Sequence, residues 1–272
     1  MTTSRTHAAV LLAALAGAAA AAFSLHAQPQ GQIPRPATQP GAPTPAPTMN
    51  HNLVVLDPAH GGSDTGSTLG DHVLEKDITL ALSGRLRTAL SAAGFTVITT
   101  RDTDAGDPLT SDQRAEIANR GRAVACIVLH ATSIGSGVHV YTSMLSPSSD
   151  QNPDLARTFI PVPWDMAQAA SVDQSLRFAS DLKTAMSAQN LPVVTGKAPV
   201  RPLDNLMCPA VAIELAPLAV AGVGPTPVTD PNYQQSVATT VTNALKKWRT
   251  HAEPPAEAAA TEVPRTVPKV LP

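Results

Sequence analysis

Three short apolar runs, each followed by a polar side chain, most constrain what this chain can fold into. His60 follows the first run in a turn with Gly61 and Gly62, His130 ends the second, and Glu214 ends the third. The runs are residues 53–56, 125–129 and 211–213. Continuous apolar runs of this length are typical of strands buried on both faces. Because groups that follow parallel strands meet at one edge of a sheet, these three side chains are expected to lie close together.

The segments between the runs have helical periodicity. Apolar residues share one face of a helix that begins at Glu75 and ends at Gly94, and cap-type residues at 110–112 precede a short helix through Asn119. Two later helices are expected over 172–186 and 233–248, and further strands over 95–100, 137–143 and 209–215. Strands that alternate with helices predict an α/β domain of three layers, with a mostly parallel sheet and helices on both faces.

The two ends of the chain differ from this pattern. Residues 1–27 are interpreted as a secretory signal peptide, because Arg5 precedes an alanine-rich apolar stretch. Residues 28–49 and 252–272 are rich in proline and are expected to be a disordered linker and a disordered tail. We therefore expect one catalytic domain over residues 50–251, exported to the periplasm or cell envelope, with no membrane span once the signal is removed.

Composition argues against nucleic acid as a partner, and the sequence does not decide whether the two cysteines are thiols or a disulfide. The net charge is −2 and aromatic residues are 3% of the chain, so nucleic acid is not an expected partner. Cys126 and Cys208 lie in or beside apolar runs, and we favour two buried thiols. A disulfide between them stays open, because an exported protein can form one.

Residues 144–170 hold four prolines, a weak pattern that favours a loop or a lid.

His60, Glu75, His130 and Glu214 form the candidate site. Two histidines, one carboxylate ligand and one spare carboxylate are the parts of a catalytic zinc hydrolase. Asp57 is expected either to orient His60 or to bind turn amides. The other polar residues are expected to be peripheral. His72 is expected in an exposed loop, His139 on a cleft wall or the surface, Arg101 and Arg114 in structural ion pairs, and Lys76 and Asp77 on a helix surface.

Six stretches form an ordered set of motifs over roughly residues 52–249. They are Leu56–Asp64, Glu75–Asp77, Thr100–Asp104, Ser111–Asn119, Leu129–Ala131 followed by Gly137–Tyr141, and Pro209–Leu215. In this order they resemble the type 3 family of zinc-dependent N-acetylmuramoyl-L-alanine amidases, which trim bacterial peptidoglycan.

The resemblance implies that His60, Glu75 and His130 bind Zn²⁺ and that Glu214 is the catalytic residue. It also implies peptidoglycan as substrate, and it leaves any protein regulator unknown. The chain departs from the family pattern at Ala59, at Thr132 and over residues 216–219, and no proposed ligand is lost. Two alternatives stay open: a peptidoglycan-binding or regulatory domain without turnover, and a zinc amidohydrolase that acts on another amide.

Overall fold

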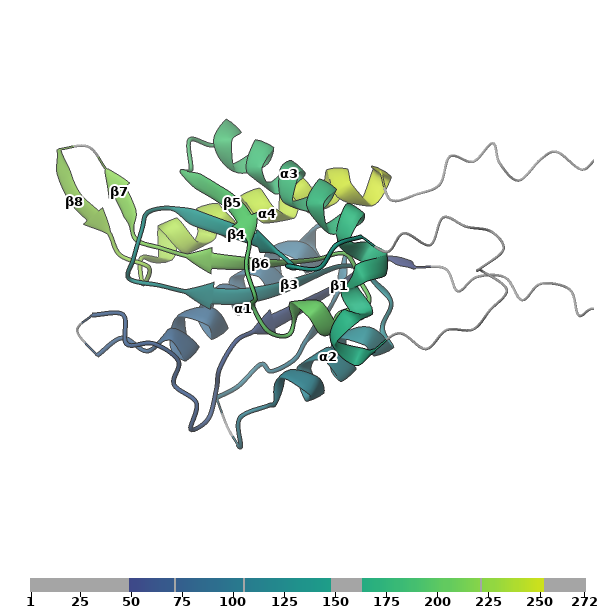
Figure 1. Ribbon diagram of the computed structural model, residues 1–272. Helices are drawn as coiled ribbons and strands as arrows, with labels where there is room; N and C mark the ends of the chain where they lie inside the picture. Colours follow the sequence, from purple (N-terminus) through teal and green to yellow (C-terminus); the bar gives the residue numbers. More distant parts are fainter. Residues whose placement is uncertain (1–48, 71, 105, 148–162, 221, 252–272) are drawn as a thin grey trace, which may run out of the picture. The chain divides into compact units, whose positions relative to one another are not determined.

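A six-stranded mixed sheet forms the centre of the computed structural model (Figure 1). The structure describes residues 49–70, 72–104, 106–147, 163–220 and 222–251. The strands lie in the order β2-β1-β3-β6-β4-β5, and neighbours are parallel except β4 and β6. Their bounds are β1 Asn50–Pro58, β2 Thr96–Thr99, β3 Ala123–Ala131, β4 Val138–Thr142, β5 Val193–Lys197 and β6 Ala210–Leu215.

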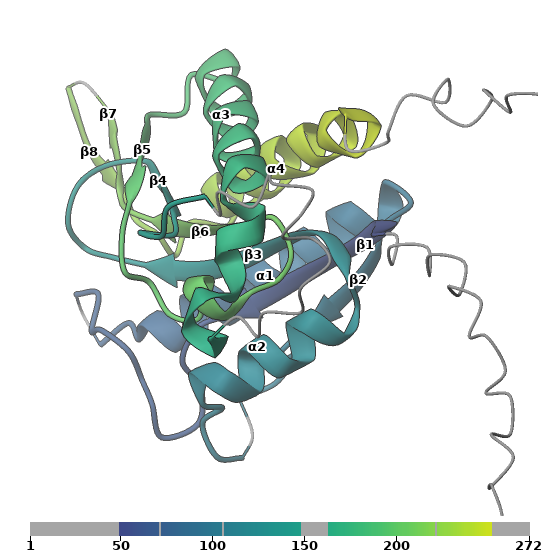
Figure 2. The same cartoon turned by 45° about the vertical axis from the view of Figure 1, so that its right-hand side comes forward.

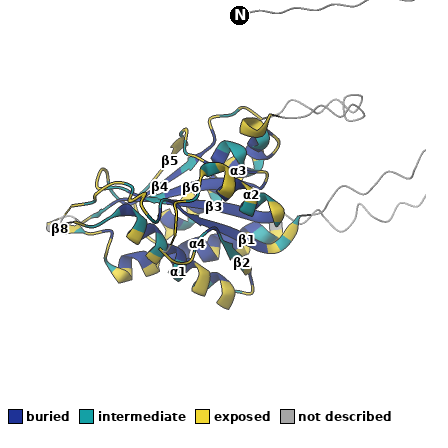
Figure 3. Ribbon diagram, turned by 90° about the horizontal axis from the view of Figure 1, so that it is seen from below, coloured by how far each residue is buried: buried dark blue, intermediate teal, exposed yellow. Residues whose placement is uncertain are grey.

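Three long helices supply the apolar side chains that bury one face of the sheet. They are α1 (Glu75–Ala92), α3 (Val172–Ala188) and α4 (Pro231–His251). The apolar side chains of α1 pack on β1, β2 and β3. The rings of Phe178 on α3 and Trp248 on α4 are in contact, with their centroids 5.4 Å apart. Buried strands therefore lie beneath helices whose outer faces are exposed (Figure 3).

Shorter helices cover the other face of the sheet. They are α2 (Ser111–Arg120) and the 3₁₀ segments η2 (Trp164–Ser171) and η3 (Leu203–Asn205). The Thr110 hydroxyl accepts a hydrogen bond from the Gln113 backbone amide, and the Gln113 side-chain oxygen accepts one from the Thr110 backbone amide. This reciprocal pair fixes where α2 begins. In Figure 2, α2 lies in front of the sheet and α1 behind it. The expected three-layer α/β arrangement is confirmed.

Some elements were not predicted from the sequence. Strand β5 and the hairpin of β7 (Leu218–Val220) and β8 (Val223–Thr226) lie in segments without a clear period of two. The end of the expected loop or lid, residues 164–170, belongs to η2, which contacts η3 and α3. The lid stays a prediction for residues 148–162, which lie outside the described residues.

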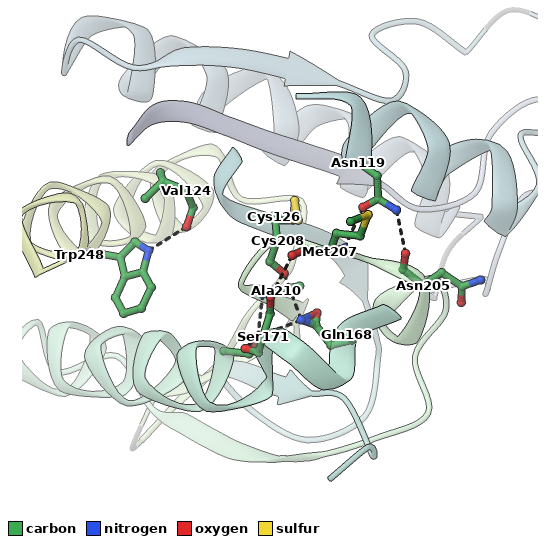
Figure 4. Close-up of a disulfide and its surroundings, with 11 residues drawn as sticks. Asn119, Val124, Cys126, Gln168, Ser171, Asn205, Met207, Cys208, Ala210 and Trp248 are labelled. Atoms are coloured by element: carbon green, nitrogen blue, oxygen red, sulfur yellow. Dashed lines mark hydrogen bonds between the residues drawn. A yellow bond between two sulfur atoms is a disulfide. The ribbon is translucent and has the colours of Figure 1, made fainter. Parts of the chain in front are cut away.

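Cys126 and Cys208 form a disulfide, so the expected pair of free thiols is wrong (Figure 4). Cys126 lies on β3, and Cys208 lies two residues before β6, the strand that pairs with β3. Their Cα atoms are 6.0 Å apart, within the range that a disulfide spans. Nearby, Gln168 and Ser171 of η2 donate hydrogen bonds to the carbonyls of Cys208 and Met207. The bridge therefore joins residues 82 apart at the start of β6.

Replacing both cysteines by alanine is expected to lower the free energy of unfolding by about 2–4 kcal/mol, because the bridge restricts the unfolded chain. Denaturant unfolding of the oxidised protein and the double variant measures the difference. Reducing the unmodified protein should give a similar loss. Equal unfolding midpoints for the oxidised protein and the double variant would contradict a bridge that stabilises the fold.

The ends of the chain carry predictions that the described residues do not test. The signal peptide over 1–27, the linker over 28–49 and the tail over 252–272 lie outside the described residues, Met49 excepted. The first described strand begins at Asn50 and the last described helix ends at His251. Among the described residues, no helix combines the length and apolar character needed to cross a membrane. The boundary of the catalytic domain at 50–251 stays a prediction.

Candidate active site

His60 is held in a turn just after β1. Its backbone has a φ of 64°, a left-handed conformation that is uncommon for residues other than glycine. The Gly61 amide donates to the Asp64 carbonyl at 2.8 Å, which closes the turn. Both carboxylate oxygens of Asp64 lie 3.0 Å from Nδ1 of His60. Asp64 therefore fixes the imidazole with its other nitrogen, Nε2, directed at Glu75.

Glu75 is the first residue of α1 and its carboxylate lies between two histidines. Oε2 is 3.2 Å from Nε2 of His60, and Oε1 is 2.8 Å from Nδ1 of His130. The amides of Ser67 and Ala131 also donate to this carboxylate. Burial alone would raise the pKa of Glu75, but the hydrogen bonds from His130, His60 and Ser67 outweigh burial and hold that pKa well below its usual range. Glu75 is therefore a carboxylate at neutral pH.

His60, Glu75 and His130 could together hold a metal ion. Each offers one ligand atom, and the three atoms lie within 4.8 Å of one another. Two ligands of one tetrahedral zinc lie about 3.4 Å apart, close to the His60–Glu75 separation of 3.2 Å. Nε2 of His130 is buried and has no hydrogen-bond partner within the described residues. Two imidazoles and a carboxylate at these distances fit the donor set of zinc.

Gly66 makes this close approach possible. A Cβ atom at residue 66 would lie 2.6 Å from Cδ2 of His60 and 2.8 Å from Oε2 of Glu75. Its φ of +63° also favours glycine. A larger residue at this position would therefore push the two candidate ligands apart.

Strand register places Glu214 beside this cluster. His130 of β3 pairs with Glu214 of β6, and Glu214 pairs with His139 of β4 on its other side. Paired residues on neighbouring strands point to the same face of a sheet, so the three side chains form a row. Nδ1 of His139 lies 2.8 Å from Oε2 of Glu214. The sequence placed His139 on a cleft wall or the surface and did not predict its contact with Glu214.

Two arginines, Arg114 buried and Arg101 partly buried, support the backbone that carries His60. Arg114 donates to the carbonyl of His60 at 2.7 Å and forms an ion pair with Asp57 at 2.7 Å, which confirms its expected role. Asp57 makes its hydrogen bonds with Thr100 and Arg114 and none with the imidazole of His60. Asp57 therefore acts on His60 only through Arg114, and Asp64 is the residue that orients the ring. Arg101 mainly donates to backbone carbonyls, among them Pro58 and Ala59.

The remaining predicted residues divide into two groups. Asp77 and His72 are exposed, as expected, and His72 is outside the metal cluster. Lys76 is not an ordinary surface residue, because its ammonium contacts Asp104 at 2.6 Å and the Gly62 carbonyl at 2.8 Å. These contacts hold the loop after His60 to α1.

The run that departs from the family pattern, residues 216–219, borders the site. The Ala216 amide donates to the Gly137 carbonyl, and the Gly137 amide donates to the Pro217 carbonyl. The Thr132 amide donates to the Leu215 carbonyl. The loop over 132–137, which follows His130, is thus tied to the segment that follows Glu214. Ile134 in this loop is 78% exposed. Both segments closely follow candidate site residues, His130 and Glu214, and both include positions that depart from the family pattern.

Solved amidase structures have the same fold as this chain. AmiC2 of Nostoc punctiforme has a TM-score of 0.53 at 22% identity, covering 75% of this chain and 99% of that one. Ami1 from Mycobacterium smegmatis has a TM-score of 0.55 at 20% identity, covering 73% and 97%. At these identities the likeness concerns the fold alone.

Sequence comparison adds the family. The germination-specific N-acetylmuramoyl-L-alanine amidase of Bacillus subtilis is 35% identical over 100 residues, covering 32% of this chain and 42% of that protein. AmiA of Salmonella typhimurium is 37% identical over 84 residues, covering 31% and 28%. The chain thus matches less than half the length of these curated relatives. A family model described as N-acetylmuramoyl-L-alanine amidase matches residues 54–247, most of the chain, so the chain belongs to that family.

Proposed function

We propose that this chain is a zinc-dependent N-acetylmuramoyl-L-alanine amidase of peptidoglycan. It would hydrolyse the amide between the lactyl group of N-acetylmuramic acid and L-alanine. The observation that carries the proposal is the His60–Glu75–His130 cluster with Glu214 in register beside His130. Membership of the amidase family supports the choice of substrate.

His60, Glu75 and His130 would hold the zinc. Zinc, when bound, would lower the pKa of a water toward ~7 and polarise the amide carbonyl. Asp64 would keep Nε2 of His60 available, since its carboxylate engages Nδ1. The amides of Ser67 and Ala131 would help to hold the Glu75 carboxylate in place, since one donates to each of its oxygens.

Glu214 would act as the general base and then the general acid. One of its carboxylate oxygens would take a proton from water as the water oxygen bonds to the carbonyl carbon. It would return that proton to the amide nitrogen as the carbon–nitrogen bond breaks, which leaves a lactyl carboxylate and a free amino group. Its side chain is 28% exposed, so substrate and solvent can reach it.

The location of the substrate agrees with the proposed export. Peptidoglycan lies outside the cytoplasmic membrane, and the signal peptide proposed over residues 1–27 would place the protein in the periplasm or cell envelope. Sequencing the amino terminus of the exported protein would test this, with residue 28 expected first. An intact Met1 in the envelope fraction would contradict removal of the signal.

Digestion of purified peptidoglycan tests the proposed activity. The released peptides should carry L-alanine at a new amino terminus, which amino-terminal analysis detects. Zinc-bound protein that hydrolyses no muropeptide would instead favour a binding or regulatory domain. Release of a different amino terminus would favour a zinc amidohydrolase of another amide.

Gly66→Ala is expected to lower zinc affinity by ~10–100-fold, the range seen when the support of a metal ligand is lost. The reason is the close approach of its added Cβ to His60 and Glu75. Gly70→Ala is the matched control, because Gly70 also has a positive φ, +74°, and has nothing within 4 Å of an added Cβ. Competition with a zinc chelator measures both affinities. Equal affinities in the two variants would contradict a metal site packed against Gly66.

A further inference from the structure

We propose that His139 is a positioning residue for Glu214, holding its carboxylate ready for proton transfer. This inference rests on the proposed function. Nδ1 of His139 lies 2.8 Å from Oε2 of Glu214, a good distance for a hydrogen bond to a charged acceptor. This contact is the only hydrogen bond of the Glu214 side chain within the described residues, so Oε1 is left for a water or the leaving nitrogen.

The sheet fixes this contact. β4 runs antiparallel to β6, and His139 lies directly opposite Glu214. The side chain of His139 is 12% exposed, while Val138 and Val140 on the same strand are buried in the core on the other face. The two backbones therefore determine the distance between the imidazole and the carboxylate, with little freedom for either side chain to turn away.

The loop over 132–137 holds the imidazole from the other side. A Cβ atom at Gly135 would lie 2.7 Å from Cε1 and 2.9 Å from Nε2 of His139, so the loop backbone passes close to the ring. The ring of Tyr141, two residues along β4, lies at 69° to the His139 ring, with the two centroids 6.2 Å apart. The imidazole is thus packed between this loop, Tyr141 and Glu214, as expected for a group that orients another.

A general base must keep its carboxylate in a fixed orientation, and this requirement explains the role assigned to His139. A carboxylate with one oxygen fixed by a donor keeps a single orientation, and orientation controls the rate of proton transfer. His139 would donate its Nδ1–H to Oε2 and move no proton to substrate. The same donor would hold the carboxylate while Glu214 cycles between base and acid.

The test compares two substitutions at residue 139. His139→Asn keeps an N–H donor near the position of Nδ1, and His139→Leu keeps apolar bulk without a donor. We expect His139→Leu to lower kcat by ~10–100-fold with little change in KM, and His139→Asn to stay within about threefold of the unmodified protein. Both variants should keep their zinc and melting temperature, and His72→Asn, an exposed histidine, is the control.

A double-mutant cycle separates positioning from a structural role. If His139 acts through Glu214, His139→Leu should cause no further loss in the Glu214→Gln background. Equal losses in the Leu and Asn variants would overturn the proposal. So would a full additional loss in the Glu214→Gln background, or a kcat effect explained by a lower melting temperature.

Nitrogen NMR of the histidine side chains tests the contact without using activity. The His139 resonance, assigned from its absence in His139→Asn, should show a protonated Nδ1 that shifts in Glu214→Leu. An unprotonated Nδ1, or a resonance unchanged in Glu214→Leu, would refute the positioning role even in an active enzyme. If the protein shows this NMR signature but hydrolyses no muropeptide, the proposed function is refuted, while the hydrogen bond between His139 and Glu214 stands.

Discussion

Glu214→Gln is expected to lower kcat by ~10²–10⁴-fold while zinc content and melting temperature stay unchanged. The amide has nearly the shape of the carboxylate and can still accept a hydrogen bond from His139, but it cannot take a proton from water. The loss should appear mainly in kcat, because Glu214 is proposed to act in the transition state. Rates of L-alanine amino-terminus release, measured beside zinc content, test this prediction.

The outcome that contradicts this prediction is turnover close to that of the unmodified protein. Another group would then be the base, and the register between His130 and Glu214 would have no catalytic meaning. His72→Asn serves as control, because His72 is exposed and has a positive φ that asparagine tolerates. A large loss of activity in that control would show that the site extends to the loop around residue 72.

Removing candidate ligands is expected to have a graded effect on zinc binding. Loss of a residue that supports a metal ligand lowers metal affinity by ~10–100-fold. His60→Ala and His130→Ala each remove a ligand itself, so each should lower zinc affinity by more than this range. Asp64→Ala should fall within that range, because Asp64 orients His60 and is not itself a proposed ligand. His72→Asn should bind zinc as the unmodified protein does. Zinc content after dialysis against a chelator measures the order.

Full zinc occupancy in the double variant His60→Ala, His130→Ala would show that the metal binds elsewhere. Losses of the same size in Asp64→Ala and His72→Asn would show a general disturbance of the loop. The melting temperature of each variant, measured without metal, separates these cases from unfolding.

Local sequence patterns predicted the parts of the structure that depend on local rules. The buried strands were found because continuous apolar runs mark strands covered on both faces. Helix α1 was found from its repeat and from Gly94, which has a φ of +84° just after the helix. The sequence also predicted that His60, His130 and Glu214 lie at one edge of the sheet, because each follows an apolar run that forms a parallel strand.

Contacts that depend on pairing between distant strands could not be predicted in the same way. The disulfide joins residues 82 apart, and its geometry follows from the pairing of β3 with β6. The contact between His139 and Glu214 requires knowing that β4 runs antiparallel to β6 in one register. Alternation along residues 138–141 showed only which face His139 occupies.

Local backbone conformation explains the other differences. Asp64 orients His60 because His60 adopts a left-handed conformation, which brings a residue four positions later to its ring. The sequence left Asp57 either to orient His60 or to bind turn amides, and Asp57 instead bonds Thr100 and Arg114. Lys76 was assigned to the surface from the helical pattern, and its contacts with Asp104 and Gly62 depend on where two loops meet.

The most direct test is a zinc titration of chelated protein, followed by the release of L-alanine amino termini from peptidoglycan. We expect no release without metal, a rise in proportion to added zinc, and a plateau at one zinc per chain. The same titration of Glu214→Gln should show zinc bound with release close to zero. Release that survives chelation in the unmodified protein, or zinc-loaded protein that frees no L-alanine terminus, would contradict a zinc-dependent muramoyl-L-alanine amidase.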